Sequence, residues 1–414
     1  MTTFHVADYG HDDNPGSAAA PWRSLQRAAG AVRPGDTITI HAGLYPGTTA
    51  ITTPDTTWTG RDRVVLAGGW NGRSTATAEA VISIQAGRTV IEGLEIANAP
   101  MHAVAVRHPA REVLIQNCTI THPARDGIHA FGRTSGRDLV IVGCTISHAG
   151  RAARIKPSLV GDGIRIRGGH GCVIACTTVD NASGSGIFID RGSRDTTVYD
   201  CSLFDNGAAA VRVGNSRGTD IDGNRIYRTR RPKATRMVRP DGILLADEIR
   251  RRPSRHTTIR DNLIVNCETL LRLKTDRNRH CHATSLDAGS SIHHNTFVAG
   301  PWTRCGIRID DNPERPGGAA AFRDNAIHGD HAPDAEMITG PRRAIAAGNN
   351  AWSRRPPPVW HGPGDIIGFR LARETAVLES DGTFNDEDFA PSAGSSLSER
   401  ATEGAAIGAL EPNP

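Results

Sequence analysis

One side-chain position that recurs along the middle of this chain limits its fold more than any other feature. Four cysteines come first, each after a short run of alternating apolar residues, and four asparagines then occupy the same position. Successive members are separated by 23 to 38 residues. A repeat of this length, built from short strands and lengthened in places by loops, is typical of a β-solenoid. The members are Cys118, Cys144, Cys176, Cys201, Asn224, Asn262, Asn295 and Asn325.

A second pattern follows most of these positions. It opens with a Gly-Ile pair or a close variant and continues as a strand in which every second residue is apolar. Each repeat therefore contains at least two strands, and a third short strand follows the Cys or Asn. Three strands per turn, stacked in register, predict an all-β fold, a single-stranded right-handed parallel β-helix. The pairs begin at Gly127, Gly163, Gly186, Ala210, Gly242, Leu270 and Gly306.

Neighbouring coils of such a solenoid lie about 4.8 Å apart, so one position repeated in every coil forms a ladder along the axis. Stacked Asn amides hydrogen-bond to one another, and stacked Cys side chains fill the same place as small apolar groups. The chain has eight cysteines but no Cys-x-x-Cys pair. We therefore expect Cys118, Cys144, Cys176 and Cys201 to be stacked free thiols rather than disulfides or zinc ligands.

The two ends of the chain are predicted to cap the solenoid. Residues 21–33 place Trp22, Leu25, Ala29 and Val32 on one face of a predicted helix. A helix here would cover the open edge of the first coil and prevent it from pairing with another molecule. We expect the β-helix to span residues 1–350, with the N-terminal cap at about 1–45, and a C-terminal closing segment at 351–414 to pack on it.

The formal net charge is +4, carried by 45 arginines and three lysines against 44 acidic residues. This modest charge, without interleaved aromatic residues, argues against nucleic acid as a partner. The sequence shows no secretion signal and no apolar run of membrane-spanning length. Free buried cysteines suit a reducing compartment. We therefore expect a cytoplasmic protein, although a secreted chain whose signal had been removed would read the same.

Both ends of the chain resemble a known group of proteins. The opening FHVADYGHDDNPGSAAAPWRSLQRAAGAVRPGDTITIHAGLYPG and the ending FAPSAGSSLSERATEGAAIGALE are similar to the corresponding segments of the pectate-lyase-like superfamily of parallel β-helix proteins. That superfamily includes polysaccharide lyases, glycoside hydrolases, uronate epimerases and non-catalytic binding proteins. The resemblance therefore implies the fold and leaves the reaction open.

The outward residues of the Gly-Ile strands predict a cationic face, because alternate residues of a strand point away from the core. Arginines stacked about 5 Å apart repel one another unless an anion lies on them. Insertions at 147–160, 227–240 and 275–290 border this strand, and long loops on a rigid scaffold are often functional. We expect a groove for an acidic, uronate-type oligo- or polysaccharide, bound by Arg165, Arg167, Arg212, Arg308, His129 and Phe188.

The expected reaction is β-elimination by a polysaccharide lyase, which needs a cation to neutralise the uronate carboxylate and a base to remove the C5 proton. Lys274 is the predicted base, with Arg272 two residues earlier on the same face. One coil before, Asp241, Asp247 and Glu248 offer oxygen ligands for Ca²⁺. This layout resembles calcium-dependent lyases whose base is a Lys one coil beyond a cluster of Asp ligands, although their paired Asp before Gly is single here.

Two alternatives remain open. Asp126 and Asp162 occupy the same position before Gly on neighbouring coils, and Asp190 lies on the next coil. These carboxylates suit the acid and base of a polygalacturonase-like inverting hydrolase, although Asp before Gly is also a common turn residue. The other alternative is a biosynthetic or binding β-helix protein without lyase activity.

Overall fold

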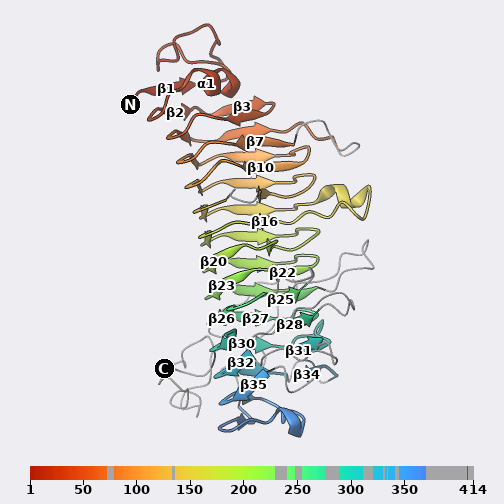
Figure 1. The fold of residues 1–414 in the computed structure, drawn as a ribbon. Helices are drawn as coiled ribbons and strands as arrows, with labels where there is room; N and C mark the ends of the chain where they lie inside the picture. Colours follow the sequence, from red (N-terminus) through yellow and green to blue (C-terminus); the bar gives the residue numbers. More distant parts are fainter. Residues whose placement is uncertain are drawn as a thin grey trace, which may run out of the picture. The chain divides into compact units, whose positions relative to one another are not determined.

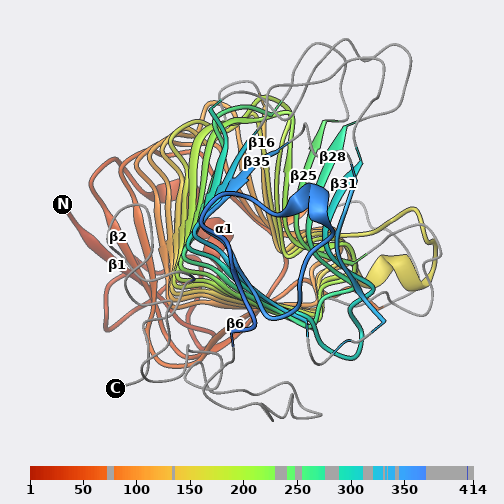
Figure 2. The ribbon, with the colours of Figure 1, turned by 90° about the horizontal axis from the view of Figure 1, so that it is seen from below.

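Short parallel strands wind into coils in both units of the computed structural model, Met1–Thr197 and Val198–Pro414. In each unit the strands of successive coils stack into three parallel sheets, as Figure 1 and Figure 2 show. Each unit is thus the predicted right-handed parallel β-helix. The structure describes residues 1–71, 79–132, 136–228, 240–247, 254–275, 289–310, 320–329, 332, 334–340, 345–369 and 408.

We number the three sheets 1, 2 and 3, and along the first unit successive strands fall in sheet 1, then sheet 3, then sheet 2. Sheet 1 contains β1 (Thr3–Val6), β2 (Thr37–Ile40), β5 (Thr57–Gly60), β8 (Val90–Glu92), β11 (Leu114–Gln116), β14 (Val140–Val142) and β17 (Val173–Ala175). Sheet 2 contains β4 (Thr49–Ile51), β7 (Ala80–Ile84), β10 (His102–Arg107), β13 (Ile128–Phe131), β16 (Ile164–Arg167) and β19 (Ile187–Asp190). Sheet 3 contains β3 (Gly43–Pro46), β6 (Val64–Ala67), β9 (Glu95–Ala97), β12 (Thr119–Thr121), β15 (Thr145–Ser147) and β18 (Thr178–Asp180).

The second unit repeats this order, and β20 (Arg194–Tyr199) runs across the junction of the two units. Its sheet 1 contains β23 (Arg217–Asp222), β26 (Thr258–Arg260), β29 (Ser291–His293), β32 (Ala320–Arg323) and β35 (Ile345–Gly348). Its sheet 2 contains β22 (Ala209–Gly214), β25 (Asp241–Asp247), β28 (Thr269–Thr275), β31 (Cys305–Asp310) and β34 (Glu336–Thr339). Its sheet 3 contains β21 (Ser202–Phe204), β24 (Arg225–Tyr227), β27 (Leu263–Val265), β30 (Thr296–Val298), β33 (Ala326–His328), β36 (Ala351–Trp352) and β37 (Ile366–Ile367).

The apolar residues that alternate along each strand stack into columns inside the coils. In sheet 1 of the first unit, Ile115 pairs in register with Ile141, which pairs with Ile174. All three side chains are buried. Burial of a column of aliphatic side chains at each inward position is what makes the repeat stable, since each coil supplies the apolar cover for its neighbours.

The cysteine ladder is confirmed at three positions and wrong at the fourth. Cys118, Cys144 and Cys201 are buried, whereas Cys176 is exposed and has a left-handed backbone with φ 48°. The register of β15 with β18 gives the ladder position to Thr177, whose hydroxyl oxygen accepts a hydrogen bond from the Cys144 N–H at 3.3 Å. The sequence analysis assigned this ladder position one residue too early, because Thr177, which is also small, directly follows Cys176. The described cysteines are all free thiols.

The asparagine ladder is confirmed and runs one coil further than predicted. The amide Nδ2 of Asn224 donates to Oδ1 of Asn262 at 2.9 Å, and Asn262 donates to Asn295 at the same distance. Asn295 continues the chain of bonds to Asn325 at 3.0 Å, and Asn325 donates to Asn350 at 3.1 Å. Asn350 is a member that the sequence analysis missed. Because these side chains are buried, the ladder fixes the register of sheets 1 and 3 in the second unit.

The N-terminal cap forms as predicted but with a shorter helix, α1 (Leu25–Ala31). The Ser24 hydroxyl caps it by accepting the N–H of Arg27 at 3.1 Å. Trp22, Leu25 and Val32 are buried as predicted, whereas Ala28 is buried in place of Ala29, which is half-exposed. No helix within the described ranges is long and apolar enough to cross a membrane.

Near the C-terminus the third sheet continues past residue 350, where the sequence repeat fades. Strand β36 pairs with β33 and with β37, and the short 3₁₀ helix η3 (Pro358–Trp360) lies between β36 and β37. Coil pairing therefore extends to Ile367. Apart from Gly408, residues 370–414 lie outside the described part of the chain, so the predicted closing segment stays a prediction.

Candidate functional site

The outward residues of sheet 2 form two columns in the first unit, as the alternation of the Gly-Ile strands predicts. Strands β13, β16 and β19 pair in register. The pairing places predicted site residues on adjacent strands with no offset between them. The first column is His129, Arg165 and Phe188, and the second is Phe131, Arg167 and Asp190.

The side chains of these columns are more buried than their outward direction on the strands suggests. His129, Phe188 and Asp190 are only 5 to 7% exposed, whereas the two arginines are half-buried. The long side chains cover their neighbours, because the guanidinium of Arg165 lies 4.8 Å from the centre of the Phe188 ring. Arg107 covers Phe131 in the same way at 5.1 Å. The face is therefore a layer of guanidinium groups over aromatic rings and carboxylates.

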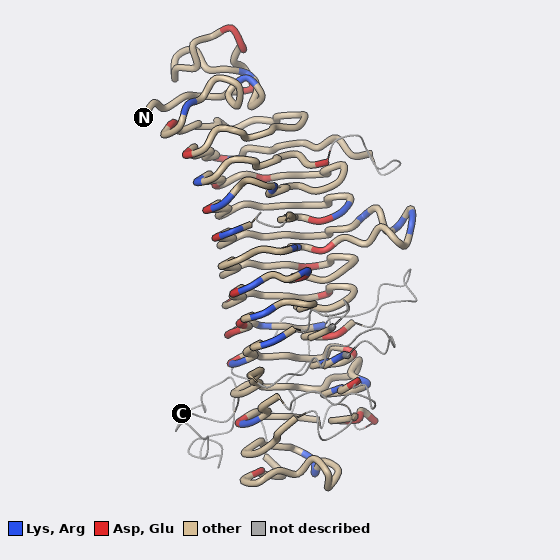
Figure 3. The backbone as a smooth tube through the Cα atoms, in the orientation of Figure 1, with Lys and Arg blue, Asp and Glu red and all other residues tan. Residues whose placement is uncertain are grey.

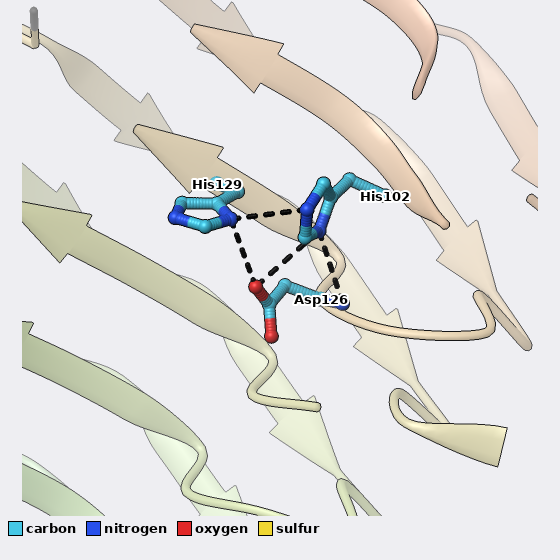
Figure 4. A group of neighbouring side chains, drawn as sticks. All are labelled: His102, Asp126 and His129. Carbon is cyan, nitrogen blue, oxygen red and sulfur yellow. Dashed lines mark hydrogen bonds and ion pairs between the residues drawn. The ribbon is translucent and has the colours of Figure 1, made fainter. Parts of the chain in front are cut away.

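Three side chains from two neighbouring coils converge beside these columns, as Figure 4 shows. His129 Nδ1 lies 3.0 Å from Asp126 Oδ2 and 3.1 Å from His102 Nε2. His102 Nδ1 lies 3.3 Å from the same carboxylate oxygen. The two imidazole rings meet edge to face, with centres 4.5 Å apart. All three residues are buried, and we call them the His-Asp-His cluster.

The position of Asp126 is set by the stacking of one coil on the next. Its Oδ1 accepts the backbone N–H of Asp162 at 2.8 Å, and Oδ1 of Asp162 accepts the N–H of Ser185 at 2.7 Å. The following glycine is required, because a Cβ at Gly127 would lie 2.6 Å from the carbonyl oxygen of Gly163. Asp before Gly is therefore a structural element of the coil, and the second carboxylate oxygen is left to face the site.

The cluster carries the Asp126 carboxylate beside a His102 imidazole that is neutral at neutral pH. Burial lowers the pKa of His102 to about 4, although the Asp126 carboxylate acts to raise it. Burial acts to raise the pKa of Asp126, but the hydrogen bond from His129 and the field of both imidazoles hold that pKa below its usual range. Positive charge on the nearby Arg165 further disfavours protonation of His102.

The two arginines of the face are weakly neutralised. Arg165 lies 3.5 Å from an Asp162 oxygen and 3.6 Å from an Asp190 oxygen, and both distances exceed those of good charged hydrogen bonds. Its Nε is buried without a hydrogen-bond partner in the described part of the chain. Arg167 forms no ion pair within 4.0 Å among the described residues. Burial, followed by repulsion from Arg165 and Arg191, lowers the pKa of Arg167.

The first basic insertion packs next to the cluster. Residues 147–160 contain the 3₁₀ helix η1 (Arg151–Arg154), which stands out from the coils of the first unit in Figure 1 and carries basic residues in Figure 3. The N–H of Gly150 donates to the carbonyl of Arg125 at 2.7 Å, directly before Asp126. The Arg151 guanidinium lies 5.8 Å from the Trp70 ring centre. This insertion therefore borders the site, as predicted.

Sheet 2 of the second unit carries the remaining predicted residues. Strands β22, β25, β28 and β31 pair in register. Arg272 donates from Nε and Nη2 to Oδ2 of Asp310 at 2.8 and 2.6 Å, and Arg308 donates to Oδ1 of the same residue at 2.9 Å. A carboxylate of the chain thus neutralises two arginines expected to bind substrate. The columns are Arg212, Leu244, Arg272 and Arg308, and Gly214, Ala246, Lys274 and Asp310.

Of the predicted calcium ligands, the Asp241 carboxyl group is the one that lies among the described residues, so the calcium site stays a prediction. Asp241 is 1% exposed, and burial raises its pKa to about 7. Its Oδ2 lies 3.7 Å from the Arg272 guanidinium, a neighbour that repels a cation. The side chain of Asp247 and all of Glu248 lie outside the described residues. Calcium takes six to eight oxygen ligands, and only one carboxyl group is placed here.

Two further predictions fall partly outside the described residues. The insertions 227–240 and 275–290 are described only at their ends, because residues 229–239 and 276–288 are not included. Lys274 itself lies half-buried on β28, in register with Ala246 and Asp310. Its role as the base remains a prediction.

His102 is the site residue that the sequence analysis missed. It precedes Asp126 by 24 residues and occupies the same position one coil earlier, since Val104 pairs with Ile128. The sequence contains the signal for His102, because Asp126 and Asp162 occupy this position on the next two coils. The same position one coil before Asp126 is His102.

Comparisons with known proteins agree with this fold. A profile described as "Pel9A-like, right handed beta helix region" matches residues 4–224, and one described as "Right handed beta helix region" matches residues 135–327. No curated protein sequence matches the chain.

Among solved structures, pectate lyase Pel9A is similar at 15% identity with a TM-score of 0.62, covering 100% of this chain and 97% of that one. An alginate lyase from Paenibacillus sp. str. FPU-7 has 16% identity and a TM-score of 0.53, covering 78% and 97%. The adhesin PfbA of Streptococcus pneumoniae has 11% identity and a TM-score of 0.59, covering 86% and 98%. At these identities the likeness concerns the fold. Because the first profile matches more than half of its length, this chain belongs to the Pel9A-like family of right-handed β-helix proteins.

Proposed function

We propose that the protein binds an acidic saccharide on sheet 2 of its first unit and cleaves it by β-elimination. The observation that carries the proposal is the state of Arg167. This guanidinium is half-buried, has no ion pair within 4.0 Å in the described part of the chain, and is repelled by Arg165 and Arg191. An anion bound here removes that repulsion, so the site favours a negatively charged ligand.

The surroundings of Arg167 suit a sugar acid better than a small inorganic anion. Phe131, which is half-buried, lies next to Arg167 in the same column, on the neighbouring strand. Arg165 precedes Arg167 by two residues on the same strand. Guanidinium groups bind carboxylates with two parallel hydrogen bonds. Aromatic rings pack against the apolar face of a sugar ring. An extended chain of uronate residues would meet both kinds of contact repeatedly along stacked strands.

Elimination requires neutralisation of the uronate carboxylate, which makes the C5 proton acidic, and a base that removes this proton. Arg272, two residues before Lys274 on β28, would neutralise the carboxylate of the sugar whose C5 proton is removed. Lys274 remains our candidate for the base, by its place on the outward face of β28. Solved structures that share the fold include proteins titled pectate lyase and alginate lyase, which supports a saccharide as the substrate class.

The hydrolase alternative is less well supported by the geometry. An inverting hydrolase needs one protonated carboxyl group to act as the acid. Asp126 has its pKa held below the usual range, and Asp162 and Asp190 both lie in ion pairs with Arg165. A carboxyl group with a lowered pKa, such as that of Asp126, is a poor proton donor at neutral pH.

Incubation with a panel of uronate oligosaccharides and matched neutral oligosaccharides tests the proposal. We expect new ultraviolet absorbance from the unsaturated uronate product, accompanied by new reducing ends. Reducing ends without this absorbance would identify a hydrolase instead. Saturable binding of the acidic ligand without any product would identify a binding protein and would rule out the elimination.

A further inference from the structure

We propose that His102, Asp126 and His129 form a binding site for a divalent transition metal such as Zn²⁺. The inference is independent of the saccharide proposal, because it rests on the donor atoms of the His-Asp-His cluster. These three residues are the group of nearby metal-ligating side chains that the described part of the chain brings together. Their potential ligand atoms all lie within 4.8 Å of one another.

The distances within the cluster are close to those of a metal site. Zinc binds nitrogen and carboxylate oxygen at about 2.0–2.2 Å, so two ligands of a tetrahedral ion lie about 3.3 Å apart. His129 Nδ1 lies 3.0 Å from Asp126 Oδ2 and 3.1 Å from His102 Nε2. His102 Nδ1 lies 3.3 Å from that oxygen but accepts the Asp126 N–H, so Nε2 is the nitrogen of this ring that would bind the ion. Small shifts of the two rings would therefore make room for an ion among the three side chains.

Hydrogen bonds within the cluster do not satisfy all of its ring nitrogens. His102 Nδ1 accepts the Asp126 N–H at 3.3 Å, so a neutral His102 carries its proton on Nε2, which faces His129 Nδ1. His129 Nδ1 can then accept from His102 or donate to the Asp126 carboxylate, but not both. The other ring nitrogen of His129, Nε2, is buried without a hydrogen-bond partner among the described residues. A buried polar group in this state costs free energy. A metal ion that accepts lone pairs from all three side chains removes the conflict at Nδ1.

The chemistry of the donors selects the kind of metal. Two imidazoles and one carboxylate suit zinc, copper, iron or nickel, whereas calcium needs six to eight oxygen ligands. Asp126 has only Oδ2 to offer, since its Oδ1 accepts the Asp162 N–H. This hydrogen bond is an outer-shell contact of the type that orients a ligating carboxylate.

The charges around the cluster allow a dication. Arg125 and Arg165 lie nearby and oppose a cation, and Asp162 and Asp190, at 3.5 and 3.6 Å from Arg165, offset part of this charge. Because His102 and His129 belong to adjacent coils of sheet 2, a bound ion would join these coils. We therefore expect metal binding to raise the melting temperature of the protein.

Titration of the tag-free, metal-stripped full-length protein with Zn²⁺ by calorimetry tests the site, with elemental analysis of the loaded protein. We expect one tightly bound Zn²⁺ per chain and a higher melting temperature. We expect no comparable binding of Ca²⁺. His102→Ala and His129→Ala should each weaken Zn²⁺ binding by at least about 100-fold, because loss of a ligand costs more than loss of an outer-shell contact.

His148→Ala is the matched control, because His148 stacks on His122 on the neighbouring sheet 3 and is no member of the cluster. It should leave Zn²⁺ binding unchanged. Co²⁺ provides a second readout, since its visible absorption should appear in the native protein and disappear in Asp126→Asn, which keeps the shape of the side chain. Absence of Zn²⁺ binding, binding that survives both histidine substitutions, or Ca²⁺ affinity equal to that of Zn²⁺ would each overturn the proposal.

Discussion

Oδ1 of Asp126 accepts the backbone N–H of Asp162 at 2.8 Å, so one carboxylate joins two coils and points its second oxygen at His129. Asp126, in the Asp-Gly pair, thus has both a structural role and a chemical role. A residue that looks like an ordinary turn aspartate is required for stacking through one oxygen and remains free for function through the other. This dual use explains why the functional residues of this fold are difficult to separate from its scaffold by sequence alone.

The asparagine ladder gives a prediction about stability. Asn262→Ala removes the amide that donates to Asn295 and accepts from both the backbone and the side chain of Asn224. Each buried group left unsatisfied costs about 1–3 kcal/mol, so we expect a loss of about 2–4 kcal/mol. Denaturant unfolding followed by circular dichroism measures it. Asn262→Cys, the residue that fills this position at Cys201, should lose less, and an equal loss would contradict the packing account.

The displaced cysteine gives a prediction about reactivity. Cys176 is exposed, whereas Cys118, Cys144 and Cys201 are buried. Brief alkylation of the native protein, followed by peptide mass mapping, should modify Cys176 well before these three. The buried thiols should react only in denaturant. Modification of Cys144 as fast as Cys176 would show that the ladder position was assigned to the wrong residue.

The buried Asp241 gives a prediction about pH. Burial raises its pKa to about 7 in the folded chain, above the ordinary value near 3.8 that it has when unfolded. The folded state therefore holds a proton that the unfolded state releases, and stability falls as the pH rises from about 4 to about 7. Asp241→Asn should flatten this part of the stability curve by an amount on the order of 2–4 kcal/mol. Denaturant unfolding at a series of pH values checks it, and an unchanged curve would contradict the assignment.

Lys274 gives a prediction about the reaction. Lys274→Ala should abolish formation of the unsaturated product while saccharide binding and melting temperature stay nearly unchanged, because a partly exposed lysine contributes little to stability. Lys274→Arg should be nearly as inactive at neutral pH, since a guanidinium keeps its proton. Steady-state kinetics on the preferred uronate substrate measures both. Retention of most activity by Lys274→Ala would exclude it as the base.

The sequence was sufficient for the architecture because a solenoid repeats its signals. The spacing of Cys118, Cys144 and the asparagines predicted the ladder, and the alternation after each Gly-Ile pair predicted which residues face outward. The error at Cys176 is a one-residue displacement, because the ladder residue lies three residues after the inward Ile115 and Ile141, and three residues after Ile174 is Thr177. Repetition along the chain thus decides the fold, whereas local register needs the pairing itself.

The site was less predictable, because its properties depend on contacts between coils. Nothing in the local sequence shows that Asp310 neutralises Arg272 and Arg308, or that Arg167 forms no ion pair within 4.0 Å among the described residues although Asp190 lies opposite it. Arginines at equivalent positions of the strand pattern therefore differ in how far nearby carboxylates neutralise them. His102 was missed because it begins its strand without the Gly-Ile signature that marked the other coils.

The most direct test of the account is the affinity of the protein for an acidic oligosaccharide, measured by calorimetry with a trigalacturonate probe and its neutral counterpart. Arg167→Ala should weaken binding of the acidic probe by about 10- to 100-fold, as a charged hydrogen bond contributes about 1.5–3 kcal/mol. Binding should also weaken as salt is added. Arg137→Ala, at an exposed arginine of the same unit, should leave it unchanged. Equal affinity for the acidic and neutral probes, or no effect of Arg167→Ala, would contradict the proposed site.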